Sequence, residues 1–472
     1  MPSRVRPPAA AGRFYPADPG TLCDTVDRLL AAAPRSEIKG RIVAALCPHA
    51  GYDYSGAPTA QVCRALAGLA PEVVVVVGTA HFADRPGFFL GEHAALRTPL
   101  GEVPVAETEA AQLLKACPEA KASAAAHAQE HSVEVLLPFL QRTFKDFRLI
   151  PVVSNSQSLS EAERFGRALA GVLKGRKALI IAASDLSHYP ARKVAGQVDP
   201  ASLESFLTLE PDYLWSTEAA LMSLDAPGLH CTWCGKAAAA AVQEAAARLG
   251  ADWGEALSCT NSADSGGDQG RTVGYGAALL LCRGQSRPWP MEQVSAEDKS
   301  ELLALARASV LAKLRGERNR PRLFERPRFN LPAAVFVTWT RRDGDLRGCI
   351  GTTAPRDTLG NAVAHYAVCS AADDPRFSAV NEDELSGLRA EISILSAPRP
   401  ARPEDIRPGL GVIVGRGRRQ GLFLPQVWEQ LPGRDEFMAH LCEHKAGLPP
   451  DSWTKDGMEL FTFTVTAFEE PR

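Results

Sequence analysis

The sequence predicts an α/β protein of two domains, and three observations lead to that fold class. Short, continuously apolar runs at 41–46, 72–78, 147–154 and 177–185 alternate with alanine-rich helical segments. Such runs are typical of strands in a mostly parallel sheet that is buried on both faces. Beyond residue 295 the runs become rich in β-branched and aromatic residues, which favours antiparallel sheet. A chain of 472 residues is also too long for a single ordinary hydrophobic core, which indicates more than one domain.

The domain boundaries follow from where these patterns change. The run 273–282 is predicted to be the last strand of a first domain, 1–283. Prolines and polar residues mark 284–294 as a linker. The second domain, 295–472, is predicted to be α+β and to begin with a helix that Ser295 and Asp298 cap and Gly316 ends.

Composition and charge exclude several classes of protein. Hydrophobic residues at 45% and charged residues at 23% indicate a globular chain rather than a disordered one. A net charge of -3 argues against nucleic-acid binding, because phosphate contacts need clustered Lys and Arg. Prolines near the N-terminus and the lack of long apolar runs predict no signal peptide and no membrane span. Eleven scattered cysteines do not form a disulfide pattern, so we expect a cytoplasmic protein.

Histidines follow three of the predicted strands. His49 follows the first strand, His81 the second, and Asp185 with His188 follows the run 177–185. Because parallel strands end at one edge of a sheet, these side chains are expected to converge there. A single loop histidine is more often structural, but several imidazoles in one place indicate a metal site with open coordination positions.

The segment 259–270 offers an acidic ligand to complete such a site. Cys259, Asp264 and Asp268 each carry an atom that can bind a cation, and the glycines between them let the backbone approach closely. The alternative is an ordinary turn stabilised by Asp and Gly. Both interpretations stay open on the residues alone.

Other polar residues are candidates for binding substrate. Glu130 and His131 lie in 128–140, where Ser132 is predicted to cap a helix. His131 and Glu134 can alternatively orient a ligating imidazole, although solvent exposure is favoured for Glu134. Tyr52 and Tyr54 follow His49 and either donate hydrogen bonds to substrate or pack the loop.

Several short motifs in order resemble the Memo family over residues 7–282. They are GRFYPADPGTL, PHAGYDYSG, GTAH, TPLGEVPV, EHSVEVLLPFL, ASDLSHY, the CG of TWCGKAA, and VGYGAALL. This resemblance implies the fold of class III extradiol dioxygenases, which are non-haem iron enzymes, and a site that contains His49, His81 and His188. The implied metal is iron(II), with copper or zinc as alternatives.

The resemblance also guides the choice of the third ligand. Eukaryotic members use a cysteine, and we align its position with Asp264 or Ser265, so that this chain departs from the cysteine version. Asp264 would complete a set of two histidines and one carboxylate with His49 and His81, and Cys259 is the second choice. His188 is then the expected acid–base catalyst, oriented by Asp185. Cys231 and Cys234, spaced C-x-x-C, are interpreted as structural because no second pair follows.

The second domain resembles the AMMECR type through LRGCIG, DDPRF, EISILS and GVIVGRGRRQGLFLPQVW. Cys349 is a candidate nucleophile whose thiolate Arg347 would favour, or Arg347 binds substrate; the alternative is a tight turn with a packed cysteine. The histidines of this domain, His365 among them, are expected to be structural. The run GRGRRQ is expected to form a hairpin tip.

A Memo-like domain joined to an AMMECR-type domain resembles the AmmeMemoRadiSam system, which implies a radical SAM protein as partner. The expected function is that of a metal-dependent, redox-active protein related to the dioxygenases, acting on an unknown substrate. A metal- or peptide-binding scaffold without catalysis is the first alternative. RNA or nucleotide modification through the second domain is the other, and the acidic balance of the chain opposes it.

Overall fold

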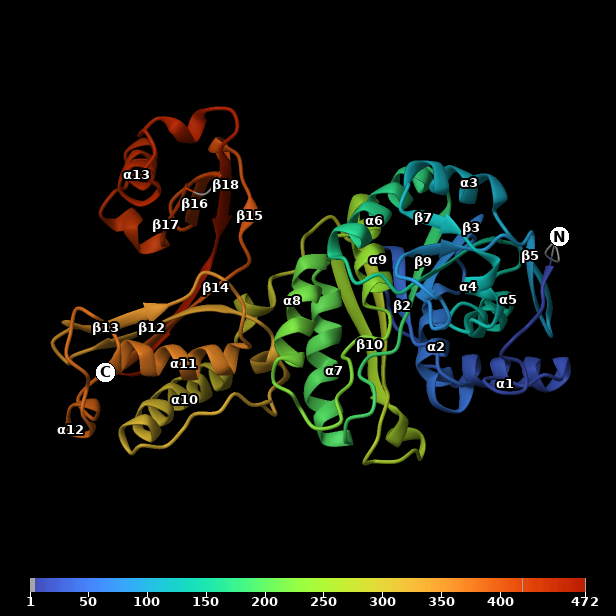
Figure 1. Ribbon diagram of the computed structural model, residues 1–472, viewed down its shortest axis with the longest axis horizontal. Coiled ribbons are helices and arrows are strands. Elements are labelled where there is room, and N and C mark those ends of the chain that lie inside the picture. Colours follow the sequence, from blue (N-terminus) through green and yellow to red (C-terminus); the bar gives the residue numbers. More distant parts are fainter. Residues whose placement is uncertain (1–4, 418, 472) are drawn as a thin grey trace. The chain divides into compact units, whose positions relative to one another are not determined.

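The structure is a computed structural model that describes residues 5–417 and 419–471. The chain divides into two compact units (Figure 1). The first unit extends to Arg287 and also contains Leu323–Leu331, and the second contains Pro288–Arg322 and the chain from Pro332 onward. None of the described helices is long and apolar enough to span a membrane.

The first unit is built on an eight-stranded sheet, which confirms the predicted α/β class. Its strand order is β10-β11-β2-β9-β3-β8-β4-β7. The central strands β2, β9, β3 and β8 run parallel, whereas β10, β11 and β4 join in antiparallel pairs. The strands are β2 (Arg41–Cys47), β3 (Val73–Thr79), β4 (Phe88–Leu90), β7 (Ala120–Ala122), β8 (Arg148–Ser154), β9 (Ala178–Ala183), β10 (Trp253–Asn261) and β11 (Gly274–Cys282).

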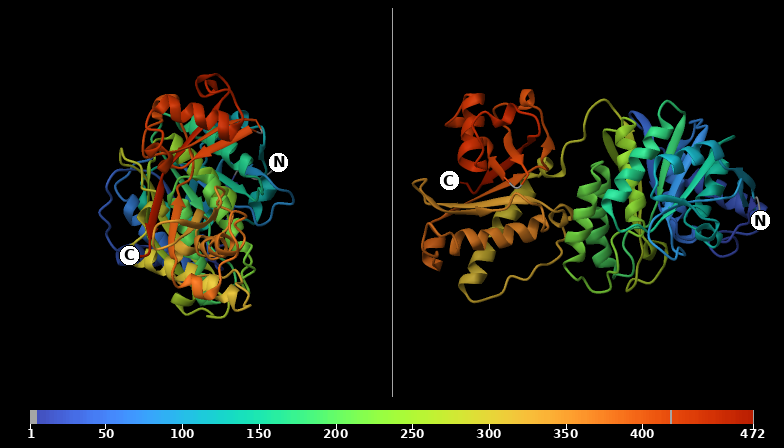
Figure 2. Two further views of the ribbon diagram at one scale, coloured as in Figure 1. Left: turned by 90° about the vertical axis from the view of Figure 1, so that its left-hand side faces the viewer. Right: turned by 45° about the horizontal axis from the view of Figure 1, so that its top comes forward.

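Helices cover both faces of this sheet (Figures 1 and 2). Val73, Val75 and Val77 of β3 belong to one hydrophobic core and Val74 and Val76 to the other, which explains why the strand is apolar throughout. One core includes helices α3 (Glu107–Ala116), α6 (Leu159–Leu173), α7 (Arg192–Leu207), α8 (Pro211–Met222) and α9 (Lys236–Arg248). The other includes α1 (Pro19–Ala32), α2 (Tyr52–Leu66) and α5 (Leu137–Thr143).

A smaller sheet, one short helix and two 3-10 turns complete the description of the first unit. The smaller sheet has the order β1-β5-β6. The elements are β1 (Val5–Arg6), β5 (Ala95–Thr98), β6 (Gly101–Pro104), α4 (Ala124–Ala128), and the 3-10 turns η1 (Glu134–Leu136) and η2 (Ser262–Ser265).

The second unit is α+β, as predicted, with two antiparallel four-stranded sheets in the orders β13-β12-β14-β19 and β15-β18-β16-β17. The strands are β12 (Ala334–Thr340), β13 (Leu346–Gly351), β14 (Arg389–Leu395), β15 (Arg399–Pro400), β16 (Gly411–Arg416), β17 (Arg419–Phe423), β18 (Glu459–Phe463) and β19 (Val465–Glu469). The helices are α10 (Ala296–Leu314), α11 (Leu359–Ala372), α12 (Glu382–Leu385) and α13 (Arg434–His440).

Two local predictions in the second unit agree with the structure. Ser295 and Asp298 form the capping box that begins α10, because each side chain accepts a hydrogen bond from the other residue's backbone N–H. Strands β16 and β17 pair antiparallel up to Arg416 and Arg419, so that the run GRGRRQ lies at a hairpin. Arg418 lies outside the described residues.

The compact units differ from the predicted domains in one segment. Leu323–Leu331, which the sequence places in the second domain, packs with the first unit. Asn330 donates a hydrogen bond to the carbonyl of Gln197 in α7 (3.1 Å), and the Gln197 side chain donates to Glu325 (3.1 Å). Phe329 and Leu331 of this segment are also buried, but they stand among charged residues and a proline, without the apolar period of a helix or strand that would signal this return in the sequence.

Glu134 is buried, which corrects the expectation of a solvated charge. Its side chain is 0% exposed and accepts hydrogen bonds from Arg6 (2.6 Å), from the Tyr15 hydroxyl (2.6 Å) and from the backbone N–H groups of Ala9 and Ala10 (both 2.8 Å). The cap predicted at Ser132 is also wrong, because its hydroxyl donates to the Thr79 carbonyl instead (2.7 Å).

Replacing Glu134 with Ala is expected to lower the free energy of unfolding of the first unit by about 3 to 5 kcal/mol, because Arg6 would keep an unpaired buried charge. The matched control is Glu102→Ala, which breaks the exposed pair with Arg97 and is expected to cost at most about 1 kcal/mol. Urea unfolding of both variants measures the difference. Equal stabilities for the two would contradict the assignment of Glu134 as a buried anchor.

Candidate metal centre

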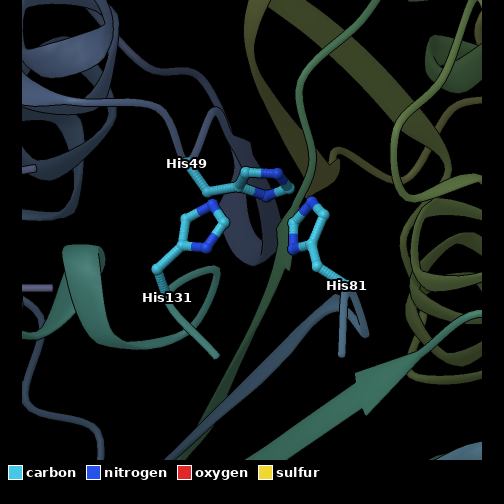
Figure 3. Close-up of side chains that lie close together, drawn as sticks. All are labelled: His49, His81 and His131. Atoms are coloured by element: carbon cyan, nitrogen blue, oxygen red, sulfur yellow. The ribbon is translucent and has the colours of Figure 1, made fainter. Parts of the chain in front are cut away.

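The predicted convergence of strand ends is present in the structure. Strands β2, β9 and β3 are neighbours in the sheet, and His49, Asp185 and His81 follow them. The His49 and His81 rings lie 5.3 Å apart between centroids. Figure 3 shows that His131, from the segment between α4 and η1, joins these two imidazoles. Ligand atoms of the three histidines all lie within 4.8 Å of one another.

His49 is held in one orientation by hydrogen bonds. Its ring Nδ1 lies 2.9 Å from the carbonyl of Ala183 at the end of β9. Since a carbonyl can only accept, Nδ1 carries the proton and Nε2 keeps its lone pair. The ring is buried, and this burial lowers the pKa of His49. His49 therefore presents a neutral nitrogen ligand toward the site.

Glu130 fixes the orientation of the His81 ring by hydrogen bonds. Its carboxylate accepts from His81 Nδ1 (2.9 Å) and from the His81 backbone N–H (2.6 Å). It also accepts from the backbone N–H groups of His131 and Ser132 (both 2.9 Å). Burial alone would raise the pKa of Glu130, but the hydrogen bonds from His81 and from the Ser132 backbone outweigh it and lower the pKa to about 2. The carboxylate stays ionised and leaves His81 Nε2 free to bind a metal.

Cys234 lies between these two ligands. Its Sγ is 3.4 Å from His81 Nε2 and 3.5 Å from His49 Nε2. With metal–nitrogen bonds of about 2.0–2.1 Å and a metal–sulfur bond of about 2.3 Å, a tetrahedral ion would separate N and S by about 3.6 Å. The distances fit a shared metal ion. Cys234, which is interpreted from the sequence as structural, is therefore a candidate for a metal ligand.

The position of Cys234 follows from the start of helix α9. Gly235 is the residue that precedes the helix, and a side chain there would come within 2.7 Å of the Thr79 hydroxyl at the end of β3. Glycine therefore lets the cysteine approach the sheet edge. The Cys234 backbone N–H also donates to the Asp185 carbonyl (3.1 Å). A Cys-Gly pair directly before a helix was the sequence signal for this ligand.

His131 is better placed to lie beside a bound metal ion than to be one of its ligands. Its ring stacks on His81 with centroids 4.6 Å apart and planes 19° apart. Lone pairs of two nearly parallel rings do not point at one common atom. Burial, with the nearby imidazoles of His49 and His81, lowers the pKa of His131 to about 3, so the ring is neutral at physiological pH.

Asp185 and His188 form the next layer of the site. Asp185 accepts from the His49 backbone N–H (2.8 Å), and its other oxygen lies 3.9 Å from His49 Nε2 and 3.8 Å from His188 Nε2. Burial would raise the pKa of Asp185, but the two histidines lower it. His188 Nε2 is buried and has no hydrogen-bond partner among the described residues. It can therefore bond to a molecule in the site.

The acidic segment predicted to supply the third ligand does not reach the cluster. Asp264 accepts from Arg192 with one oxygen (2.7 Å) and from the Asn261 backbone N–H with the other (2.9 Å), which caps η2. Asp268 accepts from the Gly270 backbone N–H (2.8 Å). Cys259 lies in β10 and is exposed. Both oxygens of Asp264 are thus used within its own segment and by Arg192, and Asp264 is not among the clustered ligand atoms of the described residues.

Of the two tyrosines predicted to contact substrate, one has a structural role. The Tyr52 hydroxyl is buried and donates to the Val135 carbonyl (2.8 Å), so that it packs the loop. Tyr54 is 42% exposed, and its contact with substrate stays a prediction.

In the second unit, Cys349 is held by its backbone rather than by Arg347. Asp374 accepts from the Cys349 N–H (2.8 Å), and Arg376 donates to the Cys349 carbonyl (3.2 Å). Arg347 instead forms two hydrogen bonds with Glu384 (2.6 and 3.0 Å), so its predicted action on the thiol is not supported. Gly348 is required because a side chain there would meet the Ser370 carbonyl of α11 at 1.9 Å.

Comparison with known proteins agrees with the division of the chain into two units. The family model for Memo-like protein matches residues 6–279, and that for AMMECR1 matches 303–468. A MEMO1 family protein of Nitrosopumilus maritimus is 33% identical over 282 residues, which covers 59% of this chain and 100% of the relative. One from Aquifex aeolicus is 35% identical over 279 residues with the same coverage. A crystal structure of an uncharacterized protein from Pyrococcus horikoshii is 36% identical, covers 38% of this chain and 93% of its own, and has a TM-score of 0.35.

Replacing Glu130 with Gln is expected to weaken the affinity for divalent metal by about 10- to 100-fold, because His81 loses the carboxylate that orients it. Glu92→Gln is the matched control, since that exposed carboxylate accepts a hydrogen bond from the Ala124 backbone N–H and is not part of the histidine cluster. Competition with a chromophoric chelator measures both affinities. An unchanged affinity in Glu130→Gln would remove Glu130 from the site.

Proposed function

The chain belongs to the Memo family and carries an AMMECR1 domain after the Memo domain, and we propose that it is a metal-dependent oxidoreductase. In this proposal His49, His81 and Cys234 hold the metal. The main support is that the Cys234 sulfur lies 3.4 Å from His81 Nε2 and 3.5 Å from His49 Nε2. The first unit thus has a donor set that transition metals accept.

We propose iron(II) as the metal. Two neutral imidazoles and one thiolate leave open coordination positions, as substrate chemistry at a metal requires. The thiolate is a soft ligand that copper and zinc also accept. Identification of the bound metal in protein purified without oxygen decides between them.

The metal would supply a Lewis-acidic, redox-active centre, and the surrounding residues would handle substrate and protons. His188 presents an unpartnered Nε2 on the same side as Asp185, which suits it to take or give a proton. His131, neutral beside His81, can accept a hydrogen bond from a substrate hydroxyl. A cavity of about 390 Å³ adjoins His81 and Cys234 and offers room for a small substrate.

We further propose that the protein works in the cytoplasm with a radical SAM protein. The support is the presence of Memo and AMMECR1 domains in one chain, together with eleven cysteines that form no disulfide in the described structure. Co-elution of the two purified proteins in size-exclusion chromatography tests the partnership. Separate elution at micromolar concentration would count against a stable complex.

Metal analysis of the protein purified without oxygen tests the proposed ligands. The wild-type chain is expected to hold one metal ion per chain, and His49→Ala and Cys234→Ala are expected to lose it, because each removes a ligand. Asp264→Asn is the matched control and is expected to keep the metal, since Asp264 pairs with Arg192. Metal loss in Asp264→Asn with retention in Cys234→Ala would contradict the proposal, and a metal-free wild-type protein would favour a binding scaffold.

A further inference from the structure

A cavity of about 740 Å³ in the second unit is lined by arginines from three elements. Arg307 comes from α10, Arg342 from the turn between β12 and β13, and Arg389 from the first position of β14. Asp343, Gly344, the segment 386–388, Glu470 and Pro471 complete the lining. The Asp343 carboxylate accepts a hydrogen bond from the Asp345 backbone N–H (3.1 Å), so the three arginines outnumber the two carboxylates of the lining. Neither the metal centre nor Cys349 contributes to this cavity.

Arg307 and Glu470 form a fixed part of the wall. Arg307 donates to Glu470 through Nε (2.9 Å) and through Nη2, and to the carbonyls of Leu385 and Leu388 (both 2.8 Å). Glu470 also accepts from the Ala390 backbone N–H (2.9 Å). The two opposite charges are therefore compensated, so that Glu470 does not repel an anion in the cavity.

Arg389 and Arg342, in contrast, have unused donors. Nε and Nη1 of Arg389 are shielded from solvent and have no acceptor among the described residues. Its remaining nitrogen lies 3.6 Å from Glu469, which is beyond hydrogen-bond distance. Arg342 is exposed and makes no hydrogen bond or ion pair within the described ranges. A charged donor without an acceptor is costly, and an oxyanion in the cavity would relieve that cost.

We propose that this cavity binds a phosphorylated small molecule, whose phosphate lies between Arg389 and Arg342. A carboxylate is satisfied by one guanidinium, whereas the three terminal oxygens of a phosphate can accept from two. Arg389 lines the cavity, and its side chain is 19% exposed. The volume exceeds that of a phosphate ion and leaves room for the group attached to it.

Isothermal titration of the full chain at constant ionic strength tests this site, with inorganic phosphate and phenyl phosphate as probes and citrate as the carboxylate probe. Both phosphates are expected to bind saturably. Arg389→Gln and Arg342→Gln are each expected to weaken that binding at least about tenfold. The matched control is Arg320→Gln, an exposed arginine in a different cavity of the same unit, for which no change is expected.

Thermal unfolding of the ligand-free variants separates binding from a structural role. Arg389→Gln is expected to keep or raise the melting temperature, because it removes buried donors that lack acceptors. Weaker phosphate binding together with a lower melting temperature would assign Arg389 to structure and overturn the proposal. The proposal is also overturned by no saturable phosphate binding to the wild-type chain, by binding of citrate alone, or by equal phosphate affinities in all three variants.

Discussion

The candidate metal centre depends on one buried carboxylate. Glu130 accepts hydrogen bonds from the ring and the backbone N–H of His81. It also accepts from the backbone N–H groups of His131 and Ser132, the two residues that follow Glu130. It thereby joins the end of β3 to the segment that carries His131, and it decides which nitrogen of His81 is free. Arg6 fixes the same segment through three acceptors, because it donates to the carbonyls of His127 and Glu130 and to the Glu134 carboxylate.

Much of the fold followed from the sequence because apolar patterns report burial directly. The valines of β3 predicted a strand buried on both faces, and Ser295 with Asp298 predicted the start of α10. The return of Leu323–Leu331 to the first unit was missed because its buried apolar residues, Phe329 and Leu331, stand among charged residues and a proline without the period of a helix or strand. Glu134 was misjudged for a related reason. A carboxylate is placed in solvent by default unless its partners, here Arg6 and Tyr15, are known.

The site was predicted in part. His49 and His81 were expected because parallel strands deliver their ends to one edge of the sheet. The proximity of Cys234 to both histidines was not expected, because Cys234 enters from the start of a helix and no strand pattern places it. The acidic segment around Asp264 looked suitable by composition, yet its oxygens are used by Arg192 and by the Asn261 backbone. In the second unit, hydrogen bonds join the motifs LRGCIG and DDPRF. Asp374 accepts from the Cys349 backbone N–H, and Arg376 donates to the Cys349 carbonyl.

In the proposed centre, a cysteine from the start of α9 shares a metal ion with the two strand-end histidines. X-ray absorption spectroscopy of the metal-loaded chain tests this arrangement, because sulfur and nitrogen scatter differently and bind at different distances. We expect one sulfur at about 2.3 Å and nitrogen at about 2.0–2.1 Å from the metal. A coordination shell of nitrogen and oxygen alone would contradict it.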